Sequence, residues 1–508
     1  MFRILGNRRR LCDGLSRRDW LHVGGLGFLG VGLSDYLRLK AAQAAPAGGS
    51  SLDATFGRAK RCILLLPYGS PPQHETFDPK LEAPEEIQGE LKAIPTSVPG
   101  YAIGEYLPKI ARVADRLTVI RSMTHPFPVH CTAYVTSGIP TYSPALESRP
   151  RDPKLWPYIG SVVDYVQGRR ESTIPLVPRN MALPWKMNSR GGPKAAAVQA
   201  GPYAAFLGPA YDPVLTEFEG EGNRKIYKIS PGGTPTGGKR HDVFDPYAGI
   251  KPDGRFTLAG AQRRDSVTLE RQNNRNGLLA RFDRARRELD RNAETQSFDR
   301  YQQLALSLVS TTRVHAALDI HQESEKLRQD YGMNLFGQSC LAARRLVEAG
   351  SRFVTVFWDE YAYLNTDWDT HWNHFYRLKD RLLPGFDLGF SALISDLEDR
   401  GMLEDTLVVW MSEHGRTPRF NKNVGRDHWS RVYSIAMAGA GVGGGNIIGE
   451  SDRLGGDVRS QPVSPKDILA TILHLLGIDA HTTIPDRQDR PVPVAGTGVV
   501  RPEIFRGA

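Results

Sequence analysis

Cysteine is scarce in this chain, with four residues among 508. Cys12 lies in an N-terminal stretch that we expect to be removed, so Cys62, Cys131 and Cys340 remain. An odd number of cysteines cannot form a disulfide framework. Cys62 and Cys340 stand in apolar or helical runs, where cysteine packs as a small hydrophobic residue.

Several familiar motifs are also missing. The chain contains no internal repeat and no P-loop. The glycine-rich run 439–445 does not follow a first strand, as a dinucleotide-binding loop would, so we interpret it as a turn. These absences argue against a nucleotide-binding domain and against a repeat protein.

A strong positive charge is missing once the first 45 residues are set aside. The whole chain carries a formal net charge of +9, and residues 1–45 hold eight Arg and Lys against three Asp, a net of +5. The rest of the chain therefore carries about +4. Because no basic stripe interleaved with aromatic residues remains, we do not expect a nucleic-acid partner.

The first 45 residues have the layout of a secretory signal. Arg17 and Arg18 precede an apolar run of 11 residues, Val23–Leu33, and the small residues of 41–45 follow. A membrane-spanning helix needs about 20 apolar residues. The paired arginines favour the twin-arginine route. We expect cleavage, no stable membrane span afterwards and a periplasmic or extracellular protein; an uncleaved anchor is the alternative.

Strand-like and helix-like patterns alternate at both ends of the remaining chain. The expected strands are 62–66, 117–120, 352–358, 405–411 and 432–438, and the expected helices are 103–114, 339–349, 386–400 and 465–476. This alternation predicts an α/β fold with a mostly parallel central sheet that helices cover on both faces. Ligands of such sheets gather beyond the carboxyl ends of the strands.

The middle of the chain has a different composition. Residues 142–260 are rich in proline and glycine, and 263–290 form a highly charged helical pattern. We expect 142–260 to cover the mouth of a site, because no periodic apolar pattern there could fill a core. Residues 46–508 would then form a single domain with an insertion at about 142–330.

Carboxylates and imidazoles concentrate in three short clusters near predicted strand ends. The clusters are 367–374 (Asp-Trp-Asp-Thr-His-Trp-Asn-His), 412–418 (Ser-Glu-His-Gly-Arg-Thr-Pro) and 425–429 (Gly-Arg-Asp-His-Trp). Together these two groups suit a divalent metal such as zinc, iron or manganese. Helix capping and surface hydrogen bonds are the alternative explanation. We predict a metal-dependent site.

Motifs along nearly the whole mature chain carry a resemblance to a known family. Residues 336–350, 368–371, 413–418 and 425–429 resemble the secreted family known as domain of unknown function 1501, which is abundant in planctomycete-type bacteria, and 69–79, 121–125 and 136–138 fit it too. That family is similar to the alkaline phosphatase and sulfatase superfamily. The resemblance implies an alkaline phosphatase/sulfatase-like α/β/α sandwich with one or two metals.

The order of parts in that superfamily implies the metal ligands. A carboxylate follows the first strand, an Asp and His pair comes next, an Asp-His pair follows a late strand, and a final His closes the set. The residues implied here are Glu75, Asp78, Asp367, Asp369, His371, Glu413, His414 and His428. Glu413 stands where the superfamily has Asp. We expect one firmly held divalent metal, zinc first, with manganese or calcium as alternatives.

The resemblance implies the catalytic side chains less clearly. Sulfatases carry Cys-x-Pro-Ser-Arg, whose cysteine becomes formylglycine, and this chain has no such motif. Cys131 and Thr132 lie in the corresponding region, where either could be a nucleophile or a packed residue. His125 and His130 could protonate a leaving group or bind metal. Arg416 suits an anionic substrate or an ion pair with Glu413.

Two functions are open at this point. The first is a metal-dependent hydrolase of sulfate or phosphate esters in the cell envelope, with an anionic small molecule or glycan as substrate. The second is a non-catalytic, sulfatase-like protein that binds anionic glycans. The missing sulfatase motif favours the second, and the carboxylate and imidazole set favours the first, which we expect.

The export signal yields a test. Changing Arg17 and Arg18 together to lysine is expected to leave the protein in the cytoplasm with its signal attached, because the twin-arginine route reads this pair. Cell fractionation and the mass of the product measure the outcome. Normal delivery of the double variant to the envelope would rule out this route.

Overall fold

The computed structural model describes residues 51–139, 149, 152, 154–171, 175–191, 201–229, 240–258, 300, 304–305, 308, 312–362 and 367–505. The chain divides into two units, Met1–Ala54 and Thr55–Ala508. The expected export signal and the charged pattern 263–290 lie outside the described residues. The second unit contains the central sheet and all the predicted site residues.

A nine-stranded sheet forms the centre of the second unit. Its strand order is β15 (Asn446–Ile448), β4 (Leu117–Met123), β14 (Tyr433–Ala438), β11 (Thr406–Trp410), β1 (Arg61–Pro67), β10 (Phe353–Trp358), β5 (Asn180–Leu183), β6 (Val214–Glu219) and β9 (Arg255–Leu258). Strand β14 runs antiparallel to both neighbours, and β9 runs antiparallel to β6. All other neighbours are parallel. The prediction of a mostly parallel sheet is confirmed.

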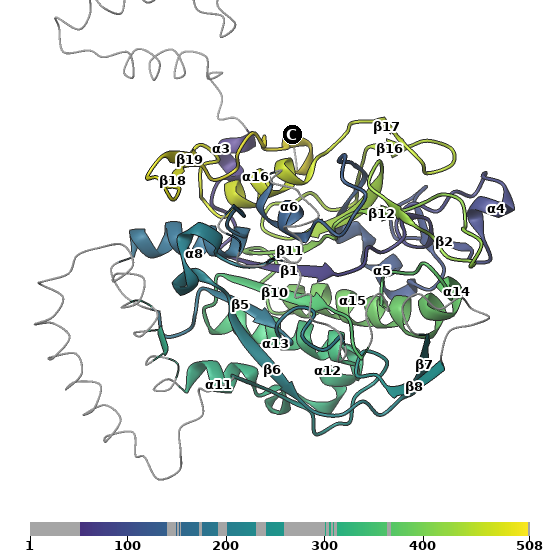
Figure 1. Cartoon of the computed structure of the whole chain (residues 1–508), viewed down its shortest axis with the longest axis horizontal. Coiled ribbons are helices and arrows are strands. Elements are labelled where there is room, and N and C mark those ends of the chain that lie inside the picture. Colours follow the sequence, from purple (N-terminus) through teal and green to yellow (C-terminus); the bar gives the residue numbers. More distant parts are fainter. Residues whose placement is uncertain are drawn as a thin grey trace, which may run out of the picture. The chain divides into compact units, whose positions relative to one another are not determined.

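The central strands are buried on both faces, as continuous apolar runs in parallel sheets are. Val354 and Val356 of β10 belong to the large core that also contains the apolar side chains of α13 (Leu335–Ala349). Thr355, between them, points to the opposite face of the sheet. There it contacts the hydroxyl of Tyr158, the residue just before α8 (Ile159–Arg170). Helices therefore cover both faces (Figure 1), which confirms the expected α/β arrangement.

Local sequence signals explain where the long helices begin and end. The Asn334 side chain accepts a hydrogen bond from Gly337 N at 2.9 Å before α13, and Gly350 closes that helix with φ 117°. Helix α16 (Pro465–Leu475) begins with a capping box of Ser464 and Asp467. These helices and α15 (Leu383–Asp399) lie where the apolar periodicity predicts them.

The helix expected over 103–114 is only partly correct. Residues 102–104 form the strand β3, which pairs with β2 (Ala93–Pro95), and the helix α5 spans only Pro108–Arg112. The residue before a proline is kept out of the helical region, and proline itself favours the first helical turn. Helix α5 therefore begins at Pro108.

The middle of the chain contributes to the sheet itself. Strands β5, β6 and β9 lie within 142–260 and extend the sheet beyond β10. The expectation that this segment only covers a site is wrong for these three strands. Each has four to six residues and is buried by partners far away in sequence, so no periodic pattern marks it. The hairpin β7 (Lys225–Ile229) and β8 (Arg240–Phe244) stands outside the sheet.

The remaining named helices and strands are shorter. They are α3 (Ser51–Thr55), α4 (Glu85–Gln88), α6 (Thr132–Ser137), α11 (Arg313–Leu318), α12 (Glu325–Asp330), α14 (His374–Arg377), β12 (Gly415–Arg416), β13 (His428–Trp429), β16 (Glu450–Ser451), β17 (Val458–Ser460), β18 (Thr483–Pro485) and β19 (Pro491–Pro493). Among the described residues, none of the helices has the length and apolar character that crossing a membrane requires.

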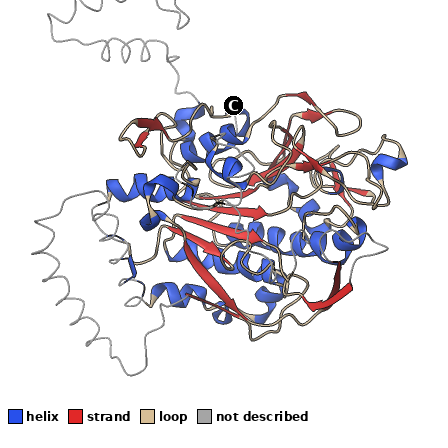
Figure 2. Cartoon of the chain, viewed as in Figure 1, coloured by secondary structure: helices blue, strands red, loops and turns tan. Residues whose placement is uncertain are grey.

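One edge of the sheet gathers the chain segments that carry the predicted site. The parallel strands end there, as the arrows in Figure 2 show, and the loops after β1, β4, β10 and β11 follow. Strand β14 runs the other way, so its beginning and the segment before it reach the same edge. The three carboxylate and imidazole clusters follow β10, follow β11 and precede β14.

Candidate metal centre

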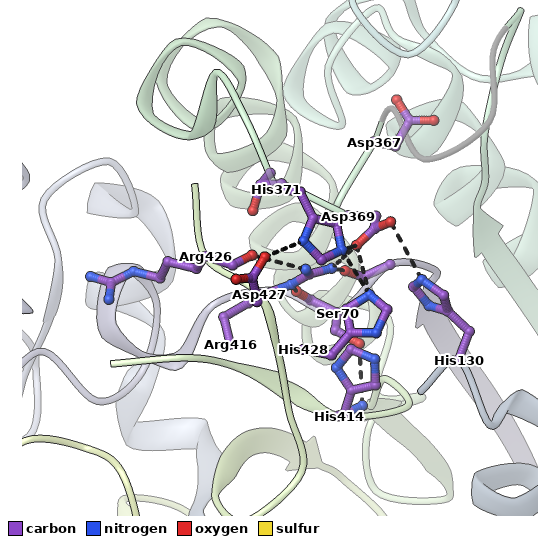
Figure 3. A network of polar contacts seen from close by, with 12 residues as sticks. Ser70, His130, Asp367, Asp369, His371, His414, Arg416, Arg426, Asp427 and His428 are labelled. Carbon is purple, nitrogen blue, oxygen red and sulfur yellow. Dashed lines mark hydrogen bonds and ion pairs between the residues drawn. The ribbon is translucent and has the colours of Figure 1, made fainter. Parts of the chain in front are cut away.

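Four histidines and one aspartate converge beyond this edge of the sheet. The side chains of His130, His414 and His428 place nitrogen atoms within 4.8 Å of one another, and those of Asp369, His371 and His428 do the same with their ligand atoms. His428 belongs to both groups. Figure 3 shows the five side chains directed toward one another.

Asp369 is the centre of the contacts. Its Oδ1 atom lies 3.0 Å from His371 Nε2, 3.1 Å from His428 Nε2 and 2.5 Å from Arg416 Nη2. Its Oδ2 atom lies 3.4 Å from His130 Nε2. Burial raises the pKa of this carboxyl, but Arg416 and His130 outweigh burial and hold the pKa well below its usual range. Asp369 is therefore an anion.

A short antiparallel ribbon places two of these side chains. Strands β12 and β13 pair so that Arg416 stands directly opposite His428. Directly opposite residues of an antiparallel pair project on the same face. Both side chains therefore reach Asp369 from one ribbon.

Two glycines allow the backbone segments around the cluster to approach one another closely. A Cβ atom on Gly69, whose φ is +98°, would lie 2.4 Å from Asp369 N. A Cβ atom on Gly425 would lie 1.9 Å from His371 O. Only glycine fits such close backbone contacts, so these residues let the loop 367–374 lie against the end of β1 and against the segment before β13.

His130 is held between two carboxylates. Its Nδ1 atom lies 2.8 Å from Glu413 Oε1, and its ring stacks on Tyr68 with centroids 4.9 Å apart. Burial lowers the pKa of His130, but Asp369 and Glu413 outweigh burial and raise it to about 10. Glu413 also accepts hydrogen bonds from Gly69 N at 2.8 Å and the Ser412 hydroxyl at 2.7 Å. Both Glu413 oxygens therefore orient neighbouring groups.

His414 and His428 present neutral nitrogens to the cluster. His414 Nδ1 bonds the Gly415 carbonyl oxygen at 2.8 Å, which leaves Nε2 as an acceptor. That Nε2 atom is buried and has no hydrogen-bond partner in the described parts of the chain. Burial, followed by the charges of His428 and His130, holds the pKa of His414 well below its usual value, and burial lowers the pKa of His428 to about 4.

Two of the predicted carboxylates, Glu75 and Asp78, make their contacts away from the histidine cluster. Glu75 Oε1 lies 2.6 Å from Arg426 Nη2 and 3.4 Å from His374 Nε2. Asp78 lies 2.9 Å from Lys80 Nζ and bonds Ser451. The structure does not bring these carboxylates to the histidine cluster.

Asp367 lies apart from the cluster, as Figure 3 shows. It is buried, and its Oδ1 atom is 3.8 Å from Arg381 Nη2. Burial raises the pKa of Asp367, and Lys228 opposes this increase. Of the two predicted Asp and His pairings, the contacts therefore join His371 to Asp369.

Two of the predicted catalytic residues, Arg416 and His125, make contacts mainly with backbone atoms around the cluster. All the guanidinium contacts of Arg416 are to protein oxygens, namely those of Ser70, Gly69, Arg426 and Asp369. His125 Nε2 lies 2.6 Å from the Glu413 carbonyl oxygen, and His125 Nδ1 accepts from Phe127 N. Arg416 and His125 therefore brace the backbone around the cluster.

Cys131 and Thr132 stand at the start of α6. Cys131 is buried, and its Sγ atom lies 3.8 Å from the Glu413 carbonyl oxygen. Thr132 is buried as well, and its hydroxyl has no hydrogen-bond partner within the described ranges. Of these two side chains, the threonine hydroxyl has the unused hydrogen-bonding capacity.

Two groups of acidic residues are absent from the predicted set, and the first of them contacts the cluster. Asp427 Oδ1 lies 2.6 Å from His371 Nδ1 and orients that ring, and its signal was its place beside His428 in the third cluster. Asp359 and Glu360 follow β10 directly and are buried, and burial raises the pKa of Asp359 to about 7. A carboxylate pair directly after a predicted strand is a signal that sequence reasoning could have used.

The donor set fits a divalent metal. Buried His414 Nε2 and Asp369 Oδ2 have no hydrogen-bond partner among the described residues, and His371 Nε2 lies 3.0 Å from His428 Nε2. Ligand nitrogens that face one another around a common point are typical of a metal site. Imidazole and carboxylate together suit zinc or manganese better than the all-oxygen sites of calcium.

The fold and this cluster define an α/β protein with a histidine-rich centre at the carboxyl edge of its sheet. The chain belongs to the family described as "Protein of unknown function (DUF1501)", whose model matches residues 59–505. The predicted family is confirmed. Comparison with curated proteins found no match.

Solved structures give distant similarities. They include Ps i-CgsB in complex with k-i-k-neocarrahexaose (12% identity, 83% of this chain and 72% of that chain, TM-score 0.36). They also include the PsFucS1 sulfatase from Pseudoalteromonas sp. (13%, 84% and 69%, 0.35) and the phosphonate monoester hydrolase SpPMH from Silicibacter pomeroyi (10%, 88% and 77%, 0.32). At such low identities and TM-scores, no activity is transferred from these proteins to this chain.

The Glu75–Arg426 pair yields a test of the contacts around Glu75. Burial raises the pKa of Glu75, but Arg426 outweighs it and lowers the pKa to about 2. The pair therefore stabilises the fold fully above pH 4.5, and this contribution is lost as pH falls toward 2. Arg426→Met is expected to lower the free energy of unfolding at pH 7 by about 3–5 kcal/mol, because it removes the cation beside a buried carboxylate, leaves that carboxylate with the His374 contact, and removes three hydrogen bonds to backbone carbonyl oxygens.

The control for this variant is Arg419→Met. Arg419 pairs with Glu86 at 2.9 Å on the surface, where both side chains are more than half exposed. Its loss is expected to cost at most about 1 kcal/mol. Urea unfolding measures both variants. Equal losses of unfolding free energy in the two variants would show that the buried Glu75 carboxylate does not depend on Arg426 for its stability.

Proposed function

We propose that this protein is a metal-dependent hydrolase of sulfate or phosphate esters that works in the cell envelope after export. The observation that carries the proposal is the convergence of three imidazoles, those of His130, His371 and His428, on one buried carboxylate, Asp369, with a fourth imidazole, His414, grouped with His130 and His428. A purely structural cluster would satisfy its own polar atoms, whereas in the described part of the protein buried His414 Nε2 has no hydrogen-bond partner and Asp369 Oδ2 has only the ion-pair contact with His130 at 3.4 Å.

One metal, with zinc as the first choice, would be held by Asp369, His371 and His428, whose ligand atoms lie within 4.8 Å of one another. His130 would either add a ligand or carry a proton for the leaving group, since its Nε2 atom faces Asp369. When bound, the metal supplies Lewis-acid polarisation of the ester oxygens. Arg416 supports a single metal, because its guanidinium already neutralises Asp369 Oδ1 at 2.5 Å.

The protein's own residues would orient the substrate and the reacting groups. Glu413 orients His130, Asp427 orients His371, and Arg416 fixes Asp369. Thr132 is our choice of nucleophile, since it begins α6 and its hydroxyl has no hydrogen-bond partner among the described residues. Cys131 packs against backbone carbonyl oxygens instead.

A non-catalytic protein that binds anionic glycans is the second candidate. The observation that favours it is the complete burial of Thr132, together with the absence of the sulfatase Cys-x-Pro-x-Arg motif from the chain. In that case the metal would serve recognition and stability alone.

Metal content tests the centre. Asp369→Asn and His428→Gln are each expected to lower the metal-to-protein ratio of the purified protein and its melting temperature together, because bound metal adds to the stability of the folded state. His481→Gln, which changes an exposed histidine outside the cluster, serves as the control. Elemental analysis gives the ratio. An unchanged metal ratio in both cluster variants would end the metal hypothesis.

The rate of ester hydrolysis tests whether the protein is a hydrolase. Metal-loaded protein is expected to hydrolyse 4-nitrophenyl sulfate or phosphate, and Thr132→Val to reduce kcat by at least about a thousandfold, as losing a nucleophile does. Ser137→Ala, at the other end of α6, is the control. Wild-type kcat in Thr132→Val would exclude this nucleophile. Hydrolysis of neither ester by the metal-loaded wild type would favour the binding protein.

A further inference from the structure

A second group of charged side chains lies beside the metal centre. It forms a pocket whose lining combines three cations with three aromatic rings: Lys228, Arg377, Arg381, Tyr227, Trp372 and Tyr376. The exposed fractions of the three cations are only 3–4%. Tyr376 is exposed, and Tyr227 and Trp372 are half-buried. The pocket therefore presents aromatic surface at its rim and positive charge beneath it.

The pocket shares a wall with the metal centre. Arg377 Nη1 donates to the Asp369 carbonyl oxygen at 2.9 Å, and Trp372 follows His371 in the chain. On the other side, the β7–β8 hairpin lies beside α14 (Figure 1) and brings Tyr227 within 4.6 Å of the Tyr376 ring. A ligand in this pocket would be a direct neighbour of a ligand at the cluster.

A π-helix shapes the floor of the pocket. Helix α14 continues into a π-helical turn, Leu378–Leu382, before α15 begins. Such turns often occur at functional sites, because the extra residue redirects the side chains of the helix. Arg377 directly precedes this turn and Arg381 lies within it, and both line the pocket.

The protein balances this charge only in part. Lys228 Nζ lies 2.9 Å from buried Asp245, and Arg381 lies 3.8 Å from Asp367. Arg377 donates to two backbone carbonyl oxygens, and its Nε atom has no hydrogen-bond partner among the described residues. Within the described residues, the carboxylates that act on these three cations are those of Asp245, Asp367 and Asp369, and Asp369 is shared with a fourth buried cation, Arg416. Asp380, on the same π-helix, is paired with Arg224. A buried cation in excess is costly, and an anionic ligand would offset that cost.

We propose that this pocket binds a second anionic group of the substrate, a sulfate, phosphate or carboxylate on the unit next to the ester at the metal centre. The inference rests on the proposed function for the position of that ester. Guanidinium groups bind such oxyanions through paired hydrogen bonds. The aromatic rim suits the apolar face of a sugar ring. The substrate class is thus an anionic oligosaccharide with charge on adjacent units.

Binding to the full-length, metal-loaded protein tests the pocket. Titration calorimetry compares a disaccharide that carries sulfate on both units with 4-nitrophenyl sulfate, which carries one. Arg381→Gln is expected to raise the Kd of the disulfated disaccharide about tenfold, because it removes a charge-assisted contact. The Kd of 4-nitrophenyl sulfate is expected to stay unchanged. Lys379→Gln, which removes a cation that pairs with Glu90 instead, is the control.

A second variant keeps the test valid if Arg381→Gln fails to fold. Tyr376→Ala changes an exposed ring of the rim, and it is expected to raise the Kd of the disaccharide about fivefold through the lost ring contact. Equal Kd values for the disaccharide in the wild type and in Tyr376→Ala would overturn the proposal, whether or not Arg381→Gln folds. An equal rise of the disaccharide Kd in Lys379→Gln would also overturn the proposal, because the overall positive charge of this region would then explain the binding.

The outcome separates this inference from the proposed function. Hydrolysis of 4-nitrophenyl esters with no dependence of disaccharide binding on Arg381 or Tyr376 would overturn the pocket and leave the hydrolase. Selective loss of disaccharide binding in both variants, without any hydrolysis by the wild type, would support the pocket and exclude the hydrolase.

Discussion

The contact between Asp369 and Arg416 is the interaction on which the centre depends. Both side chains are buried, and the guanidinium that neutralises Asp369 also donates to the carbonyl oxygens of Gly69, Ser70 and Arg426. One side chain thereby ties together the segment after β1, the segment before β13 and the loop after β10. Without this cation, a buried carboxylate surrounded by imidazoles would lose the group that contributes most to its low pKa.

The sequence predicts five of the nine strands of the sheet and names all five residues of the cluster, and their binding of a metal stays a prediction. Five strands and three long helices were predictable because apolar periodicity and glycine or serine caps mark them. Asp369, His371, His414 and His428 were predictable because they stand in clusters at strand ends. Their meeting point also depends on the approach at Gly69 and Gly425, which no local pattern reveals.

The predicted carboxylates that lie outside the histidine cluster show what sequence spacing leaves out. Glu75 and Asp78 follow the first strand, as the family resemblance requires, yet each is held by a cation that is remote in sequence, Arg426 and Arg121 among them. Both oxygens of Glu413 contact neighbouring groups, and the binding of a metal by this carboxylate stays a prediction. The same residue types serve ion pairs and metals, so only the three-dimensional partners distinguish these uses. Strands β5, β6 and β9 escaped prediction for a similar reason, since distant neighbours bury them.

The antiparallel direction of β14 has a consequence for the order of assembly. Because this strand enters the sheet at the site edge, the last histidine of the cluster, His428, precedes it in the chain, whereas His130 follows β4, some three hundred residues earlier. No short fragment of the chain contains both. Contacts of such long sequence separation form late in folding. A metal held at this centre would thus be captured only after nearly the whole sheet is in place, and its presence would mark a finished molecule.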